Sequence, residues 1–264
     1  EYESVRIPNR GLLGFNYVYN QQQHLSSVIY PNGYRVYSSP NALGQPTALY
    51  RTGKTYLSNG LYHPNGMLKS YTLGNGVEHL TTLNSSSNLP SEIKYYKNTN
   101  TVAKFNYQYD QNANIIRIID GVDSGYSLNT LQYDGLDRIT NIYGNSKIGN
   151  STHRYDALGN IEYFSNKNRS LNYYYDRSTN LLDSVVSSGT KDKDYGYFNY
   201  DSRGNITHNS HFNMSYNLAN QMVEANGNTY LYDGHNRRVT QNDKGNISYS
   251  FYSKDGQLIY RDSN

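Results

Sequence analysis

Hydrophobic and polar residues alternate along short stretches of this chain. In FNYQYD, Phe105, Tyr107 and Tyr109 fall on one face, while Asn106 and Gln108 fall on the other. The stretches LNYYYD (171–176) and FNYVYN (15–20) repeat the pattern. A period of two over short runs bounded by Gly, Asn and Asp predicts β-strands. No stretch long enough for a helix has helical periodicity, so the sequence predicts an all-β fold.

A short phrase built on tyrosine and aspartate recurs along the chain. Twelve copies align on one anchor position and are separated by 16 to 26 residues. The anchor is Tyr in 10 of 12 copies, the next residue is Asp or Asn in 10, and the sixth residue after the anchor is Ile, Leu or Met in 10. Such spacing is typical of repeat arrays. The weaker copies are anchored at Tyr19, Pro40, Tyr62 and Leu83.

Each phrase has the composition of a tight hairpin loop. Asp156–Gly159 and Asp201–Gly204 place Asp first and Gly fourth, as a type I turn prefers. The fourth residue is Gly, Asn or Asp in 8 of 12 copies, and these residues tolerate a left-handed backbone. A type I turn followed by a left-handed residue predicts a three-residue hairpin loop with a bulge. Four copies depart from this rule and predict longer or looser loops, at Gln23, Ser87, Ala113 and Thr179.

We interpret the repeated residues as structural anchors, with Tyr ending one strand and the aliphatic residue starting the next. The anchor tyrosines are expected to share one face of a continuous sheet, stacked along successive hairpins. A second signal, Asn-Gly at 32–33, 59–60, 65–66, 75–76 and 226–227, predicts two-residue hairpin loops. The predicted anchors are Tyr19, Tyr62, Tyr109, Asp110, Tyr133, Asp134, Tyr155, Asp156, Gly159, Tyr175, Asp176, Tyr200, Asp201, Gly204, Tyr216, Tyr232, Asp233 and Tyr252.

The composition predicts a sheet with little conventional core. Hydrophobic residues make up 36% of the 264 residues, below the ~45–50% of ordinary globular domains. Disordered chains are poor in aromatic residues, whereas this chain has 31 tyrosines. We therefore expect the strands to be stabilised by cross-strand tyrosine pairs, each contributing roughly 0.2–1 kcal/mol.

Charge and cysteine content exclude several partners. The formal net charge is +3, and Lys and Arg are scattered, so the chain lacks the basic patch of a nucleic-acid-binding protein. The absence of cysteine excludes disulfides and thiolate metal sites. We find no signal peptide and no apolar stretch long enough to span a membrane.

No residue has the context of a catalytic, cofactor-binding or metal-binding group. His208 and His211 would lie on opposite faces of a strand–turn segment, so they are not expected to share a metal. The repeated aspartates are better explained as turn-opening residues than as calcium ligands, because Asn replaces Asp at the same position. The sequence therefore predicts a protein that is not an enzyme and has no cofactor.

Several stretches resemble a known family. YDALGNI (155–161), YDSRGNI (200–206) and YDGHNRRV (232–239), together with IYPNG (29–33) and LGNGV (73–77), resemble the YD repeats of bacterial Rhs proteins. The same repeat occurs in the B and C components of insecticidal toxin complexes and in animal teneurins. The resemblance implies a long β-ribbon of hairpins that spirals into a hollow shell. In the bacterial members the shell encloses a C-terminal toxin domain; in teneurins it serves cell adhesion.

One family feature is missing. Bacterial Rhs cores close with a segment rich in Asp-Pro, where self-cleavage frees the toxin, but this sequence has no Asp-Pro. Self-cleavage residues therefore cannot be assigned. We expect one YD-repeat region over residues 1–264, an internal piece of a larger shell whose exposed edge strands favour self-association.

These observations lead to two functional hypotheses. The first is a structural shell segment of a secreted or exported bacterial protein, extracellular or on the cell surface, that encapsulates and helps to deliver a C-terminal toxin. Its partners would be the remainder of its own shell polypeptide and the toxin cargo. The alternative is an extracellular module that binds a carbohydrate or a receptor through its tyrosine-rich faces.

Overall fold

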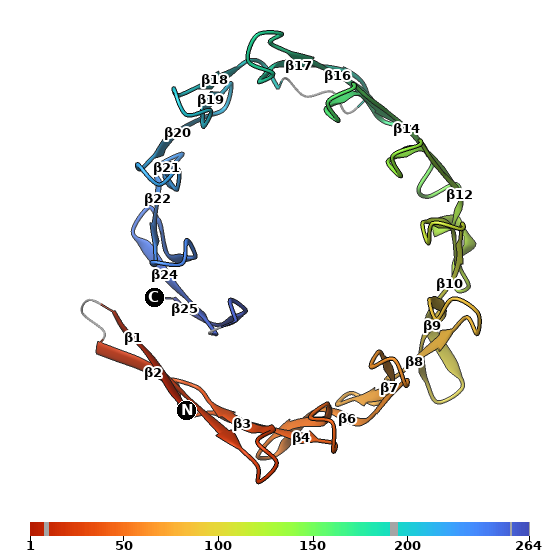
Figure 1. The fold of residues 1–264 in the computed structure, drawn as a ribbon, viewed down its shortest axis with the longest axis vertical. Helices are drawn as coiled ribbons and strands as arrows, with labels where there is room; N and C mark the ends of the chain where they lie inside the picture. Colours follow the sequence, from red (N-terminus) through yellow and green to blue (C-terminus); the bar gives the residue numbers. More distant parts are fainter. Residues whose placement is uncertain (8–10, 191–194, 254, 264) are drawn as a thin grey trace. The chain divides into compact units, whose positions relative to one another are not determined.

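The computed structural model describes residues 1–7, 11–190, 195–253 and 255–263, and it divides the chain into two compact units, Glu1–Asn150 and Ser151–Asn264. The described residues form 25 β-strands and one three-residue 3-10 turn, Ser124–Tyr126, in agreement with the predicted all-β fold (Figure 1).

In the first unit, each strand from β1 to β12 pairs antiparallel with the strand that follows it in the sequence, so the chain makes a meander. The strands are β1 (Tyr2–Ile7), β2 (Gly11–Tyr19), β3 (Leu25–Ile29), β4 (Arg35–Pro40), β5 (Pro46–Arg51), β6 (Lys54–Tyr62), β7 (Leu68–Leu73), β8 (Glu78–Leu83), β9 (Pro90–Lys97), β10 (Asn100–Tyr109), β11 (Ile115–Asp120), β12 (Leu128–Tyr133) and β13 (Ile139–Gly144).

The second unit continues the same pattern from β14, whose first residue is Asn150. Strands β14 to β17 pair in order, as do β18 to β25, and an antiparallel bridge joins Ser184 to Tyr197 between the two sets. The strands are β14 (Asn150–Tyr155), β15 (Ile161–Asn166), β16 (Arg169–Tyr175), β17 (Leu182–Gly189), β18 (Phe198–Tyr200), β19 (Ile206–Asn209), β20 (Phe212–Tyr216), β21 (Met222–Ala225), β22 (Asn228–Tyr232), β23 (Arg238–Asp243), β24 (Asn246–Tyr252) and β25 (Leu258–Ser263).

The loops at the repeated phrase have the predicted geometry. At the Tyr155 copy, Asp156 N donates to Asn160 O at 2.9 Å and Gly159 N donates to Asp156 O at 3.2 Å. Gly159 is left-handed with φ +92°, and the strand register shifts beside the turn. This is a type I turn followed by a left-handed residue, the three-residue loop that the sequence predicts.

The four departing copies split into two classes. At Asn84 and Asp176 the loop is one residue longer, and the left-handed residues are Asn88 and Asn180, as the departure predicts. At Gln23 and Ala113 the prediction is wrong, because both residues are themselves left-handed, with φ +63° and +66°, in loops of ordinary length. A non-glycine residue in the left-handed backbone conformation costs ~1–2 kcal/mol. A longer loop would shift the strand register and turn the side chains to the wrong face, so the strained loop of ordinary length is favoured.

The Asn-Gly signal was wrong at most of its positions. Only 226–227 forms a two-residue loop, between the paired residues Ala225 and Asn228. The glycines at 33, 66 and 76 are the left-handed residues of three-residue loops, and Asn59 lies at an irregularity within β6. A glycine that follows Asn can serve the last position of either loop, so the dipeptide does not determine loop length.

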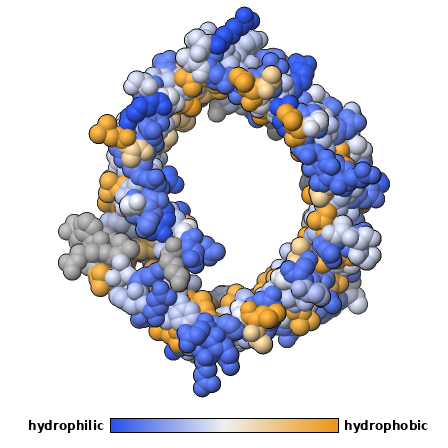
Figure 2. Space-filling model, in the orientation of Figure 1, coloured by the Kyte–Doolittle hydropathy of each residue, from blue (hydrophilic) through white to orange (hydrophobic). Residues whose placement is uncertain are grey.

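The packing is sparse, as predicted. Within the described residues, the buried apolar side chains are Phe15, Leu131, Leu171, Val185, Tyr230 and Phe251. Figure 2 shows hydrophobic and hydrophilic residues interspersed on the visible surface. The predicted tyrosine pairing occurs between Tyr37 and Tyr50, which stack with ring centroids 5.2 Å apart. Other tyrosines pack against cations, so tyrosine pairing is only part of the stabilisation: Arg154 lies 4.1 Å from the centre of the Tyr163 ring.

Candidate functional site

The predicted anchor tyrosines all occupy the last position of a strand. Tyr19, Tyr62, Tyr109, Tyr133, Tyr155, Tyr175, Tyr200, Tyr216, Tyr232 and Tyr252 end β2, β6, β10, β12, β14, β16, β18, β20, β22 and β24, respectively. The repeated Asp follows and opens the loop. We call the three-residue or four-residue loops after these strands the anchor loops. Whether the anchors determine the stability of the ribbon stays a prediction, which the substitutions below address.

The aspartate binds its own loop. Asp156 Oδ1 accepts from the backbone N of Leu158 at 2.9 Å and of Asn160 at 2.8 Å, and its Oδ2 accepts from Asn160 Nδ2 at 2.8 Å. These bonds stabilise the ionised carboxylate, so the Asn160 side chain, with the loop N–H groups, lowers the pKa of Asp156. Side-chain hydrogen bonds from Ser178 and from Asn205 are the main causes that lower the pKa of Asp176 and Asp201 to about 2.

The tyrosine hydroxyls connect successive hairpins. In seven pairs, the hydroxyl donates to the carbonyl of the first residue of the return strand in the preceding hairpin, at distances from 2.7 to 3.1 Å. The pairs are Tyr62–Pro46, Tyr109–Pro90, Tyr133–Ile115, Tyr175–Ile161, Tyr200–Leu182, Tyr232–Met222 and Tyr252–Arg238. A phenol satisfies an acceptor at the strand end and covers the neighbouring hairpin with its ring.

A second set of bonds joins neighbouring anchor loops. The residue after the left-handed position donates its side-chain amide to the left-handed residue of the next loop, and we call each such bond a rung. The rungs are Asn114–Asp137 at 2.7 Å, Asn160–Asn180 at 2.9 Å, Asn205–Asn220 at 2.9 Å and Gln221–Asn236 at 2.7 Å. The left-handed position thus carries Asn or Asp where it accepts a rung. In these loops the residue supplies a hydrogen-bond acceptor that Gly lacks, in addition to tolerating the left-handed backbone.

Sequence reasoning missed the rung donors. Asn114, Asn160, Asn205 and Gln221 stand at one offset, five residues after their anchor tyrosines. The signal was present: each of these four amides is followed in the next copy by Asn or Asp at the left-handed position. It was overlooked because the two partners belong to different copies of the repeat.

Arginine can replace the amide at the rung-donor position. Arg138 and Arg237 bond the aspartate of their own loops through Nε, both at 2.7 Å. Arg237 also donates from Nη1 to the backbone oxygen of Ser253 in the next loop, at 2.9 Å. The side chains of the anchor loops thus tie each loop internally and to its neighbour.

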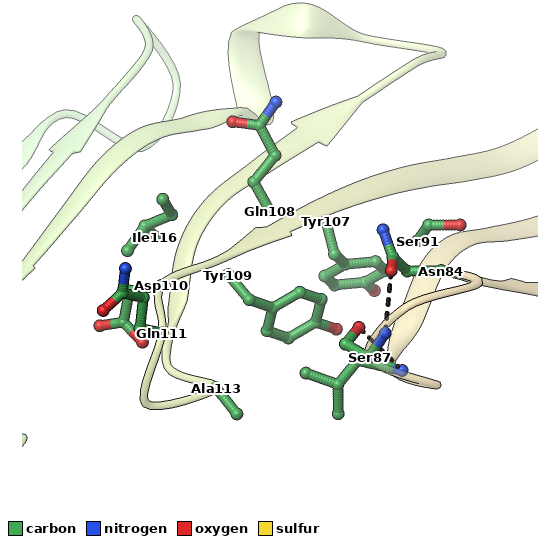
Figure 3. A pocket seen from close by; sticks show the side chains of 11 residues that line it. Asn84, Ser87, Ser91, Tyr107, Gln108, Tyr109, Asp110, Gln111, Ala113 and Ile116 are labelled. Atoms are coloured by element: carbon green, nitrogen blue, oxygen red, sulfur yellow. Dashed lines mark hydrogen bonds between the residues drawn. The ribbon is translucent and has the colours of Figure 1, made fainter.

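Two neighbouring loops leave an open pocket in the first unit. It lies between the loop after β8 and the loop after β10, with a volume of about 500 Å³. Its lining includes Asn84, Ser87 and Leu89 from one side and Tyr107 and Tyr109 from the other (Figure 3). No group of three or more His, Cys, Asp or Glu side chains with metal-binding geometry occurs among the described residues.

Comparison with solved structures shows the same fold in chains of Tc toxins. A chain of the TcdB2–TccC3–TEV crystal structure aligns with 94% of this chain at a TM-score of 0.74 and 14% identity. A chain of the Photorhabdus luminescens Tc holotoxin pore aligns with 95% at 0.64 and 13%. The TcdB2–TccC3 crystal structure aligns with 94% at 0.63 and 14%. No protein-family model and no curated protein matches the sequence.

The chain therefore has the fold of the Rhs-repeat shell chains of Tc toxins, as its YD phrases imply. It aligns with only 15–16% of the length of those chains. At sequence identities of 13–14%, the likeness concerns the fold alone.

Proposed function

We propose that this chain is a wall segment of a YD-repeat shell that encloses a toxin segment, in a bacterial protein related to Rhs proteins and toxin complexes. The observation that carries the proposal is the succession of antiparallel hairpins in each unit, joined sideways by tyrosine hydroxyls and rungs. Such a ribbon can cover a large area with few buried apolar residues, which suits a wall better than a compact domain.

The comparisons support the proposal through the fold. One of the similar crystal structures is of TcdB2–TccC3 without its hypervariable C-terminal region, and its chain aligns with 94% of ours at a TM-score of 0.60. By analogy, the partners of this chain would be the remaining wall of its own polypeptide and a C-terminal cargo, in an exported or cell-surface protein. No membrane-spanning helix occurs among the described residues.

Limited proteolysis tests the proposal in the polypeptide as the organism makes it. A wall should protect an enclosed segment from an added protease while exposed parts are cleaved. Gly74→Val should remove this protection, because a side chain at Gly74 would collide with the backbone oxygen of Thr55. Gly135→Val is the matched control, because a Cβ at Gly135 meets no atom within 4 Å.

The expected result is a protected fragment in the natural protein and in the Gly135→Val variant, and its loss in the Gly74→Val variant. Equal cleavage of all three proteins, with no protected fragment, would contradict the shell function.

A further inference from the structure

The pocket of the first unit marks an interruption in the series of rungs. The loop after β8 places Leu89 at the rung-donor position, and the loop after β10 places Ala113 at the rung-acceptor position. Neither side chain can form a hydrogen bond. The loop after β8 is also one residue longer than most. The two loops are therefore not joined as Asn114 and Asp137 are, and a cavity of about 500 Å³ lies between them.

One wall of the pocket is aromatic. Tyr107 and Tyr109 are two apart on β10 and share a face of the strand, and Figure 3 shows their rings side by side, directed toward the loop that carries Ser87. The Tyr109 hydroxyl donates to Pro90 O at 2.9 Å. The Tyr107 hydroxyl has no hydrogen-bond partner among the described residues, although burial raises the pKa of this phenol. It therefore stays protonated and can donate to a ligand.

The opposite wall offers neutral polar groups. Asn84 Oδ1 accepts from the backbone N of Ser86 and Ser87, so its Nδ2 points away from those bonds and can donate. Ser91 Oγ donates to Thr82 O at 3.2 Å and keeps its lone pairs for a ligand hydroxyl. Asp110 is the one ionised residue of the lining, and its carboxylate already accepts from Asn112 and Asn114.

We propose that this pocket is a binding site for a neutral sugar ring of the pyranose class. A pyranose has an apolar C–H face that packs on an aromatic ring, and a rim of hydroxyls that pair with amides and hydroxyls. The pocket volume lies within the ~300–1,000 Å³ range of small-molecule sites. The lining has no cationic group, so a phosphate or an acidic sugar would lack a counter-charge. The site is independent of the shell function.

Saturation-transfer NMR on the purified chain can detect this binding. The probes are the methyl glycosides of glucose, galactose, mannose and N-acetylglucosamine, each titrated to high concentration. The expected result is transfer to the ring protons of at least one glycoside, with a Kd on the order of 1 mM, as few contacts allow. Absence of transfer to all four sugars would overturn the proposal.

Two variants test whether the sugar binds in this pocket. The double substitution Leu89→Asn with Ala113→Asn copies the amide pairs of the intact rungs and should close the gap. It should leave the free energy of unfolding unchanged or higher, since Asn adopts a left-handed backbone more readily than Ala. Sugar binding should fall at least tenfold. Sugar binding that survives in this stable variant would overturn the site assignment.

Tyr107→Phe removes only the unpartnered hydroxyl and should weaken binding about twofold to twelvefold, the effect of one hydrogen bond of ~0.5–1.5 kcal/mol. Tyr143→Phe is the control, since Tyr143 is exposed and lies outside the pocket. Equal affinity in the two phenylalanine variants would contradict the proposed hydrogen bond from the Tyr107 hydroxyl to the sugar.

Discussion

His79 is a buried histidine held between two tyrosine rings. Its ring centroid lies 4.5 Å from that of Tyr71 and 4.7 Å from that of Tyr95. Its Nε2 lies 2.8 Å from Thr81 Oγ, while Nδ1 is buried without a hydrogen-bond partner among the described residues. A charged imidazole would lose hydration here, so burial lowers the pKa of His79 below its ordinary value of 6.5.

This shift predicts that acid destabilises the fold. The unfolded chain binds the proton more readily than the folded chain. The contribution of His79 is therefore complete above the unfolded pKa of about 6.5 and is lost as the pH falls toward the lower folded pKa. Urea unfolding should show that the change from pH 7.5 to pH 5 lowers the free energy of unfolding less in the His79→Phe variant than in the natural chain. Phenylalanine at this position keeps the aromatic stack. His235→Phe, at an exposed position, is the control and should behave like the natural chain. An identical loss in all three proteins would contradict the prediction.

Gly159 requires a backbone that other residues adopt with difficulty. At φ +92°, a β-branched side chain meets a steric penalty, so Gly159→Val should lower the free energy of unfolding by about 2 kcal/mol. Asp156→Asn should cost little, because Asn217 opens an equivalent loop and pairs through its own amide with Gln221 at 2.6 Å. Urea midpoints of the two variants measure the difference. If Asp156→Asn cost as much as Gly159→Val, the interpretation of the turn would be wrong.

The turns were predictable because their causes are local. Asp156, Gly159 and Asn160 act on backbone groups within five residues, so a single copy of the phrase contains the evidence. The pocket was not predictable from one copy. It depends on Leu89 and Ala113, which depart from the pattern in two successive copies. Each departure is harmless alone, and together they leave the loops unjoined.

At the scale of the strands and hairpins, the tyrosine hydroxyls should carry part of the cohesion between hairpins. Tyr175 donates to Ile161 O at 3.1 Å, whereas its neighbour Tyr174 is 52% exposed and makes no hydrogen bond through its hydroxyl among the described residues. Tyr175→Phe should therefore lower the free energy of unfolding by ~0.5–1.5 kcal/mol. Tyr174→Phe, the matched control from the adjacent position, should change it by less. Thermal or urea unfolding of both variants measures the two changes in the free energy of unfolding. A larger change at Tyr174 would contradict the anchor role of Tyr175.

The sequence predicts which strands pair within a hairpin, but it does not predict the contacts between hairpins. Alternation and turn composition predict that each anchor tyrosine ends a strand, and Tyr109 and Tyr133 do so. The bond from Tyr133 to Ile115 joins residues 18 apart in different hairpins. Spacings of 16 to 26 residues between copies leave the sideways register open in the sequence, and backbone pairing determines it.

At the scale of the whole molecule, area limits what this chain can enclose alone. Its 25 strands, at ~4.8 Å each, add up to ~120 Å of sheet width over the two units. With strands ~20 Å long, this sheet covers roughly 2,400 Å² in total. A compact cargo of ~100 residues has a radius of gyration near 13 Å, and a sheet wrapped around it needs about 6,000 Å². The chain supplies less than half of that area, so we expect the missing wall to come from other chain segments or other copies.

If the chain is the proposed wall segment, it should associate with other copies, because exposed edge strands favour pairing with further strands. Light scattering over a tenfold or wider concentration range should show a molar mass that rises above 30.2 kDa. Circular dichroism of the same samples should keep the β-sheet signal, and it serves as the control for aggregation of unfolded chain. A particle that stays at one chain mass throughout, and whose small-angle scattering shows a closed cavity of protein size, would contradict both the area estimate and the inference that this chain forms only part of a shell.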